Sequence, residues 1–93
     1  MIKKYRKKSL TPVEAIQAKG TPESNREIID WTRGSLTPAS MCKNAEDEKK
    51  LSIAGITDGA YWVSPGDFII KGYGNVFYHY SQSSFNEDFE EVK

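Results

Sequence analysis

The chain has 93 residues, 38% of them hydrophobic and 28% charged, and its 13 basic and 13 acidic side chains give a formal net charge of zero. This length and balance are typical of one soluble globular domain covering residues 1–93. A zero net charge argues against a dedicated duplex-DNA-binding protein, since that function requires many unopposed contacts with phosphates. Duplex DNA is therefore not an expected partner.

Cys42 is the only cysteine, so no disulfide can form within the chain, and a reducing compartment fits. No apolar run approaches the length of a membrane span. The basic opening MIKKYRKK is followed by the polar SLTPVEAIQ, which is unlike the apolar region of a signal peptide. We therefore expect a cytoplasmic protein with no membrane partner.

The first predicted element is a strand close to the start of the chain. Residues 3–8 are mostly basic and form either an exposed arm or the polar edge of a first strand. Pro12 restricts Thr11 to extended backbone. The VEAIQ run that follows predicts a strand at about residues 12–18.

A helix is predicted at about residues 22–33. Thr21 suits the N-cap, and Pro22 suits the first helical position, where no amide donor is needed. Ile28 and Trp31 recur on one side of this helix. Because so short a helix is marginal by itself, we expect these two side chains to pack it against a sheet.

Residues 35–50 give the weakest structural signals. Leu36, Met41 and Cys42 are compatible with a short strand. The run NAEDEKK at residues 44–50 is either a charged loop or a single helical turn.

Alternating apolar residues return after this segment. Leu51 and Ile53, with Ile56 as a further candidate, indicate a strand that closes on a turn at residues 57–59. Residues 60–63 then indicate another strand.

A β-hairpin at about residues 67–80 is the clearest tertiary signal. Residues 64–67 contain a Pro-Gly turn. The apolar strands at residues 68–71 and 76–80 are joined by GYGN at residues 72–75, whose glycines and asparagine tolerate positive φ. Each strand alternates its faces, so neighbouring side chains point in opposite directions.

The last apolar pair is Phe85 and Phe89, whose spacing fits one amphipathic helical turn or a short terminal strand. The order of elements is strand, helix, an uncertain segment, and then consecutive strands. It predicts an α+β fold, a mainly antiparallel sheet with one packed helix at about residues 22–33 and a C-terminal hairpin at about residues 67–80.

Charge is unevenly distributed along the chain. The first twenty residues carry six basic side chains against Glu14, and the last thirteen carry four acidic side chains against Lys93. This polarity either steers a partner to one end or is neutralised when the two ends meet across a sheet.

Several of these segments together resemble a widespread, uncharacterised family of small phage and prophage proteins. The shared features are KYRKK leading to VEAIQ, then PGDFIIKG, an FY pair and a final F-x-x-x-F-E, which cover about residues 3–20 and 62–91. This chain departs from the family pattern at Ala18, Asn75, and His79 with Tyr80. The resemblance implies a phage origin and a host-cytoplasmic location, and it supplies no mechanism.

The residue types that carry chemistry are sparse. His79 is the only histidine, and no motif spacing joins it to Cys42, Asp58 or Asp67, so a hydrogen-bonded histidine on a sheet face is favoured over a catalytic or metal-binding one. Asp67 after its turn is expected to cap backbone amides. Cys42 is expected to be a small, semi-buried hydrophobe. No enzymatic activity, cofactor or metal site is predicted.

Aromatic side chains are the main functional signal, because one helix cannot bury them all. Tyrosines near basic groups suit nucleotide stacking and also protein interfaces, while a core of Phe and Trp with a tyrosine rim explains the same pattern without function. The predicted ligand- or partner-binding residues are Tyr61, Tyr73, Tyr78, His79, Tyr80, Lys71, Lys4 and Arg6.

These observations lead us to expect a phage-encoded, non-enzymatic binding protein with a host-takeover or counter-defence role. Its partner is expected to be a host protein or a nucleotide-derived immune signal, and an exposed aromatic face also allows a homo-oligomer. Two alternatives stay open, a minor virion or assembly component and an accessory protein that binds single-stranded nucleic acid.

Overall fold

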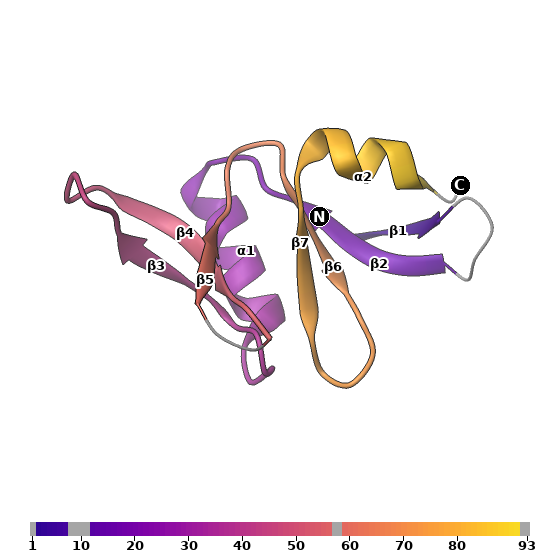
Figure 1. Ribbon diagram of the computed structural model, residues 1–93, viewed down its shortest axis with the longest axis horizontal. Helices are drawn as coiled ribbons and strands as arrows, with labels where there is room; N and C mark the ends of the chain where they lie inside the picture. Colours follow the sequence, from indigo (N-terminus) through magenta and orange to yellow (C-terminus); the bar gives the residue numbers. More distant parts are fainter. Residues whose placement is uncertain (1, 8–11, 57–58, 92–93) are drawn as a thin grey trace.

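The computed structural model describes residues 2–7, 12–56 and 59–91. The elements in these residues are β1 (Ile2–Lys7), β2 (Pro12–Gln17), α1 (Pro22–Thr32), β3 (Ala39–Lys43), β4 (Lys49–Ala54), β5 (Ala60–Trp62), β6 (Phe68–Lys71), β7 (Phe77–Tyr80), α2 (Gln82–Asp88) and β8 (Phe89–Glu91). The strands form a large sheet in the order β7-β6-β2-β1-β8 and a small sheet in the order β3-β4-β5 (Figure 1). All strand pairs are antiparallel, which confirms the predicted α+β class.

The first strand–helix unit forms as predicted. Strand β2 is central in the large sheet and pairs with β1 and β6. Helix α1 begins after Thr21, whose Oγ1 accepts a hydrogen bond from the Ser24 N–H at 3.1 Å. Ile28 is fully buried and Trp31 is half-buried against the same core. The basic segment, as far as residue 7, is a strand with a neighbour on each side, and residue 8 lies outside the described residues.

The small sheet corrects two expectations at its ends. Leu36 lies before β3 and is 68% exposed, and its backbone N–H donates to the Asn75 carbonyl at 3.0 Å instead of joining the ladder of the small sheet. Ile56 follows the end of β4 and is 58% exposed. Residues 44–47 form a turn in which the Asn44 N–H donates to the Glu48 carbonyl at 2.9 Å. Two residues of the predicted turn at 57–59 lie outside the described residues.

The C-terminal hairpin has the predicted turn chemistry. Strands β6 and β7 pair with Ile69 opposite His79 and Ile70 opposite Tyr78. In the connecting turn Gly74 has φ +74° and Asn75 has φ +63°, so asparagine supplies the left-handed conformation here.

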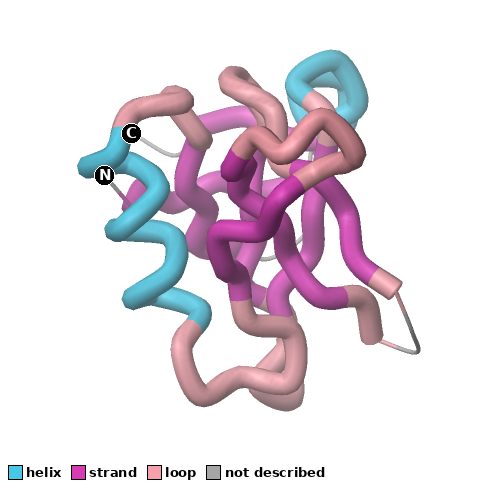
Figure 2. The backbone as a smooth tube through the Cα atoms, turned by 90° about the vertical axis from the view of Figure 1, so that its left-hand side faces the viewer, coloured by secondary structure: helices cyan, strands magenta, loops and turns pink. Residues whose placement is uncertain are grey.

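Each face of the large sheet is covered by different elements. On one face Ile16, Ile69 and Phe77 share a core with Ile28 of α1 and Ile53 of the small sheet. On the other face α2 covers a second cluster that contains Ala15, Phe68, Ile70, Phe85 and Phe89, with Tyr5, Val13 and Tyr80 packed against it. Figure 2 shows the two helices on opposite sides of the strands.

The segment that contains Phe85 and Phe89 forms both of the predicted alternatives, a helical segment followed by a short strand. Phe85 lies in α2 and Phe89 opens β8, and both are buried. Strand β8 pairs with β1, placing Glu91 opposite Tyr5 and the Lys3 ammonium 3.9 Å from the Glu91 carboxylate. The two oppositely charged ends therefore meet across the large sheet.

Candidate functional site

An open groove lies between the small sheet and strand β7. Its volume is about 560 Å³, and its lining consists of Ile53, Ala54, Gly55, Ile56, Tyr61, Phe77, Tyr78, His79 and Tyr80. Residues 53–56 come from the end of β4 and the turn after it, Tyr61 comes from β5, and the last four are the whole of β7. We call this hollow the β5–β7 groove.

Four consecutive residues of one strand line this groove, and that fixes its position. Successive side chains of a strand point to opposite faces, so a hollow that touches residues 77–80 must run along the edge of β7. Tyr80 packs its ring on Phe85 and Phe89 at the opposite face, with centroids 6.4 and 5.5 Å away. Tyr78 lies against Gly72, where an added Cβ would collide with the ring. The side chains on the groove face are therefore those of Phe77 and His79.

His79 is held in place by Asp67. The ring Nε2 lies 2.8 Å from Asp67 Oδ2, and the two side chains are only 20% and 15% exposed. The same carboxylate oxygen accepts the backbone N–H of Ser64 at 3.0 Å. The predicted roles are both confirmed, because Asp67 caps a backbone amide and His79 is a hydrogen-bonded histidine on a sheet face.

The other ring nitrogen of His79, Nδ1, is not sealed inside the protein. Within the described part of the chain, no buried side-chain nitrogen or oxygen lacks a hydrogen-bond partner, and the ring makes no hydrogen bond there beyond the one to Asp67. Nδ1 is therefore accessible. In the neutral tautomer whose Nε2–H donates a hydrogen bond to the Asp67 carboxylate, Nδ1 is a hydrogen-bond acceptor.

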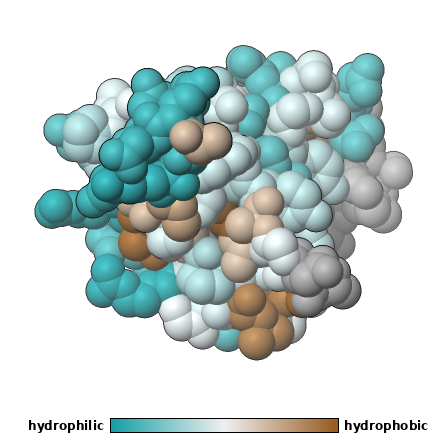
Figure 3. All heavy atoms as spheres, turned by 60° about the vertical axis from the view of Figure 1, so that its left-hand side comes forward, coloured by the Kyte–Doolittle hydropathy of each residue, from teal (hydrophilic) through white to brown (hydrophobic). Residues whose placement is uncertain are grey.

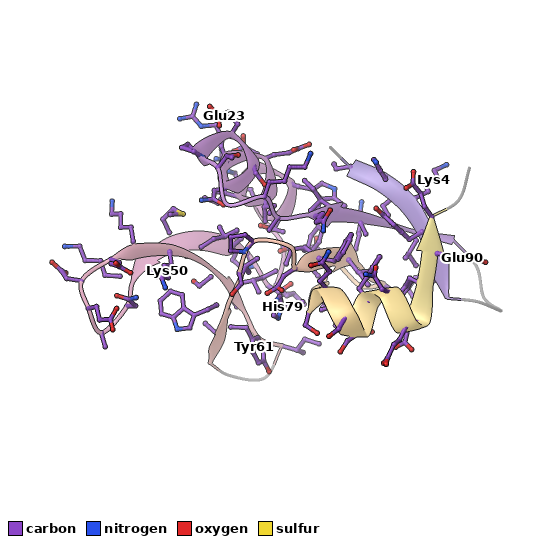
Figure 4. The ribbon with its side chains drawn as sticks, turned by 90° about the horizontal axis from the view of Figure 1, so that it is seen from above. Lys4, Glu23, Lys50, Tyr61, His79 and Glu90 are labelled. Atoms are coloured by element: carbon purple, nitrogen blue, oxygen red, sulfur yellow. The ribbon has the colours of Figure 1, made fainter. Side chains whose placement is uncertain are left out.

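Tyr61 completes the aromatic wall of the groove. Its ring stacks on the His79 imidazole with an interplanar angle of 20° and a centroid distance of 6.2 Å, and Figure 4 shows the two side chains near each other at the middle of the molecule. Tyr61 is 57% exposed and Ile56 is 58% exposed. The groove thus presents apolar and aromatic surface that water covers in the isolated chain.

The structure brings together some of the predicted site residues and separates others. Tyr61, Tyr78, His79 and Tyr80 line the groove, the two at 78 and 80 along the strand edge. Tyr73 is 90% exposed in the β6–β7 turn, and Lys71 ends β6. Lys4 lies on β1, toward the other end of the molecule from Tyr61 (Figure 4). Arg6 also lies on β1, opposite Glu90 of the neighbouring strand β8.

Residues 53–56 belong to the groove and were not among the predicted site residues. One signal pointed to them: Ile56 breaks the alternation set by Leu51 and Ile53. An isoleucine that leaves the pattern of its strand lies off the buried face, and here it becomes exposed groove surface.

No lysine or arginine lines the groove among the described residues.

At the tip of the small sheet, Lys43 pairs with Asp47 at 3.2 Å and Lys50 lies 3.8 Å from Glu48. A larger hollow of about 670 Å³ lies at that tip, between the β3–β4 turn, Trp62 and the start of α1. Figure 3 shows hydrophilic residues over the upper part of this side and small hydrophobic patches lower down.

Cys42 corrects an expectation, because it is exposed and not semi-buried. Its Sγ lies 3.4 Å from Ser40 Oγ and accepts a hydrogen bond from Ser52 Oγ at 3.2 Å. These hydroxyls, that of Ser40 first, hold the pKa of the Cys42 thiol below its ordinary value.

The described residues contain no group of three or more His, Cys, Asp or Glu side chains placed to hold a metal ion. Neither α1 nor α2 has the length and apolarity needed to cross a membrane. Comparison with protein-family models, with curated proteins and with solved structures finds no match.

Proposed function

We propose that this chain is a phage-encoded, non-enzymatic binding protein that acts on a host protein through the β5–β7 groove, in host takeover or counter-defence. The phage origin is supported by the resemblance of the KYRKK–VEAIQ and PGDFIIKG segments to small phage proteins. The binding role is supported by one observation above the others, an open groove whose exposed wall is apolar and aromatic. Such surface is enriched where proteins bind partners.

Binding explains the chemistry of the groove better than catalysis does. The Asp67–His79 pair resembles the base half of a nucleophilic site. In the described part of the chain, however, no serine, threonine or cysteine side chain is hydrogen-bonded to the His79 ring. The Asp67 carboxylate makes two structural hydrogen bonds, one with the His79 imidazole and one with the backbone N–H of Ser64. The pair therefore serves to fix the His79 ring as part of the groove wall.

A protein partner fits this groove better than a nucleotide-derived signal. Phosphate groups require cationic or backbone N–H donors to offset their charge. The described lining offers no lysine or arginine, and Lys4 and Lys71 lie elsewhere. Tyr61 offers a face on which a base could stack, but the described lining has no lysine or arginine to offset the charge of the phosphates.

The test is recovery of the host partner with matched tyrosine variants. The tagged chain is incubated with infected-host lysate, and the bound material is measured by native mass spectrometry. We expect Tyr61→Ala to reduce the recovered partner by about tenfold or more, since truncating an aromatic hot-spot residue costs about 2 kcal/mol or more and tenfold corresponds to about 1.4 kcal/mol. Tyr73→Ala removes an equally large but remote exposed side chain, and it should recover as much partner as the unmodified chain.

Two results would contradict the proposal. One is equal loss of the partner in both tyrosine variants, which would place binding outside the groove. The other is an unmodified chain that recovers no host protein, whether or not it recovers a small molecule.

A further inference from the structure

Among the described residues, each sheet has two edge strands without a further neighbouring strand, and these edges differ in how they are protected. The outer strands are β8 and β7 in the large sheet and β3 and β5 in the small sheet. Proteins commonly blunt such edges with charge, short length or a covering segment. Strand β8 carries Glu90 and Glu91, β3 contacts α1 and ends in Lys43, and β5 has only three residues. Strand β7, FYHY, carries no aspartate, glutamate, lysine or arginine.

The direction of the backbone groups in β7 follows from the hairpin pairing. The Gly72 N–H donates to the Val76 carbonyl at 2.8 Å. Hydrogen-bonded and non-bonded pairs alternate along an antiparallel ladder, so the backbone groups of Phe77 and His79 point away from β6. The Phe77 N–H confirms this direction, because it donates to Thr37 Oγ1 at 2.7 Å.

Thr37 covers the start of this edge, and His79 is the position left open. In the described part of the chain, no hydrogen bond involves the backbone N–H or carbonyl of His79. His79 lines the β5–β7 groove, so these backbone groups lie at the edge of that groove. A single residue thus offers a backbone donor and a backbone acceptor beside apolar surface.

These features together select the kind of occupant. An added strand pairs its main chain with a free edge, and alternate side chains fill pockets beside that edge. The surface beside His79 consists of Ile53, Ala54, Ile56 and Tyr61, so an uncharged, apolar side chain fits there. A charged one would lose hydration without gaining a partner.

A second copy of this chain fits the groove less well. A two-fold contact places the same patch of both copies against each other and therefore requires a self-complementary surface. The β5–β7 groove is hollow, so two grooves facing each other would enclose a void. The occupant must be a convex, narrow segment.

We propose that the occupant of the β5–β7 groove is a short, extended, uncharged peptide segment of the partner protein, which adds to the large sheet as a strand beside β7 and pairs with the backbone of His79. This inference rests on the proposed function and specifies how the groove recognises its partner. It adds a sixth strand to the large sheet at an edge that no described strand of the chain occupies.

The test begins with a displayed library of short linear peptides of random sequence, selected on the immobilised chain. We expect enrichment of uncharged sequences that are rich in β-branched and aromatic residues, the residue types that favour strands. Ile56→Asp places a charge in the groove at an exposed position, and it should weaken the selected peptides by about tenfold or more. Leu36→Asp is the matched control, because Leu36 is also exposed but does not line the groove.

Amide hydrogen exchange then separates strand addition from simple filling of the groove. The His79 amide should exchange quickly in the free chain and about tenfold or more slowly with a selected peptide bound, because pairing gives it an acceptor. Unchanged exchange at His79 would overturn strand addition, as would failure to enrich any peptide. Protection that grows with protein concentration in the absence of peptide would assign the edge to a second copy and would also overturn it.

The proposed function has a separate readout. If no peptide is selected while Tyr61→Ala still abolishes recovery of a host protein, the groove binds its partner by another mode. In that case the strand inference fails and the binding function stands.

Discussion

At the scale of single residues, His79 shows how a lone histidine acquires a defined role without a motif. It is followed by a tyrosine, preceded by another, and separated from Asp67 by twelve positions. The hairpin alone brings the two together, because Asp67 ends the turn before β6 and His79 lies on the partner strand opposite Ile69. The imidazole is therefore positioned by strand register.

Cys42 provides a pH-dependent prediction at the same scale. The Ser40 and Ser52 hydroxyls lower the pKa of its thiol, and the thiolate is the form that reacts with alkylating agents. In the unmodified chain the rate of iodoacetamide labelling should therefore rise at lower pH than in Ser40→Ala, where the lost hydrogen bond moves the thiol pKa upward. Because the chain has one cysteine, mass spectrometry reports the rate directly.

Ser83→Ala is the control variant for Ser40→Ala, because it also removes an exposed serine hydroxyl but at a position distant in sequence from Cys42. Its labelling profile should superimpose on that of the unmodified chain. Profiles that coincide for Ser40→Ala as well would show that the Ser40 hydroxyl does not stabilise the thiolate.

At the scale of elements, the second aromatic cluster makes α2 part of the fold. Phe85 is 1% exposed, and its ring stacks on Phe68 and Phe89 at centroid distances of 3.8 and 4.7 Å. We predict that Phe85→Ala lowers the free energy of unfolding by about 3–5 kcal/mol, through lost burial and a residual cavity. Urea unfolding measures this change. Tyr73→Ala, at a 90% exposed site, should stay within about 0.5 kcal/mol, and equal effects of the two would contradict the packing role of α2.

Two buried threonines connect elements that lie in different layers. Thr32 Oγ1 accepts the Ala39 N–H at 2.8 Å and joins α1 to β3. Thr37 Oγ1 accepts the Phe77 N–H at 2.7 Å and joins the segment before β3 to the edge of β7. Hydroxyl groups thus satisfy backbone donors that the strand ladders leave unpaired.

The Thr37 contact supplies an element-scale prediction. Thr37→Val keeps the side-chain shape but leaves the Phe77 N–H buried without an acceptor. The free energy of unfolding should fall by about 1–3 kcal/mol in urea denaturation. Thr37→Ser keeps the hydroxyl and should lose less, and a valine variant as stable as the serine variant would contradict the role of this hydrogen bond.

The sequence could predict the elements whose signals are local. The Thr21–Pro22 start of α1 and the GYGN turn depend on neighbouring residues, and both are confirmed. The division into two sheets could not be predicted, because it depends on which distant strands pair. Phe85 and Phe89 have a spacing that fits a helix or a strand, and only their packing on Phe68 assigns each of them.

At the scale of the whole molecule, the candidate site exists because the small sheet and the large sheet meet at an edge. Tyr61 and His79 could be chosen from the sequence as aromatic candidates, since they fall in one β-rich stretch. Lys4 and Arg6 were grouped with them by charge, but β1 is separated from β7 by two strands of the large sheet. Charge along the sequence gives no strand order, so this separation required the fold.

The separation of β1 from the groove also changes the expected electrostatics of binding. The basic start of the chain pairs with the acidic end through β1 and β8, as in the Lys3–Glu91 contact at 3.9 Å. Among the described residues, no aspartate, glutamate, lysine or arginine lines the β5–β7 groove. The affinity of a partner in this groove should therefore depend mainly on apolar contact and backbone pairing, which salt screens weakly.

The most direct test of the central claim maps the binding of a purified partner onto the chain by NMR. The partner recovered from lysate is added to ¹⁵N-labelled protein, and changes in backbone amide shifts are recorded. The account predicts that the largest changes fall on residues 53–56, Tyr61 and residues 77–80, with little change at Lys4 or Tyr73. Changes concentrated on β1 and the β6–β7 turn, with the groove residues unaffected, would contradict it.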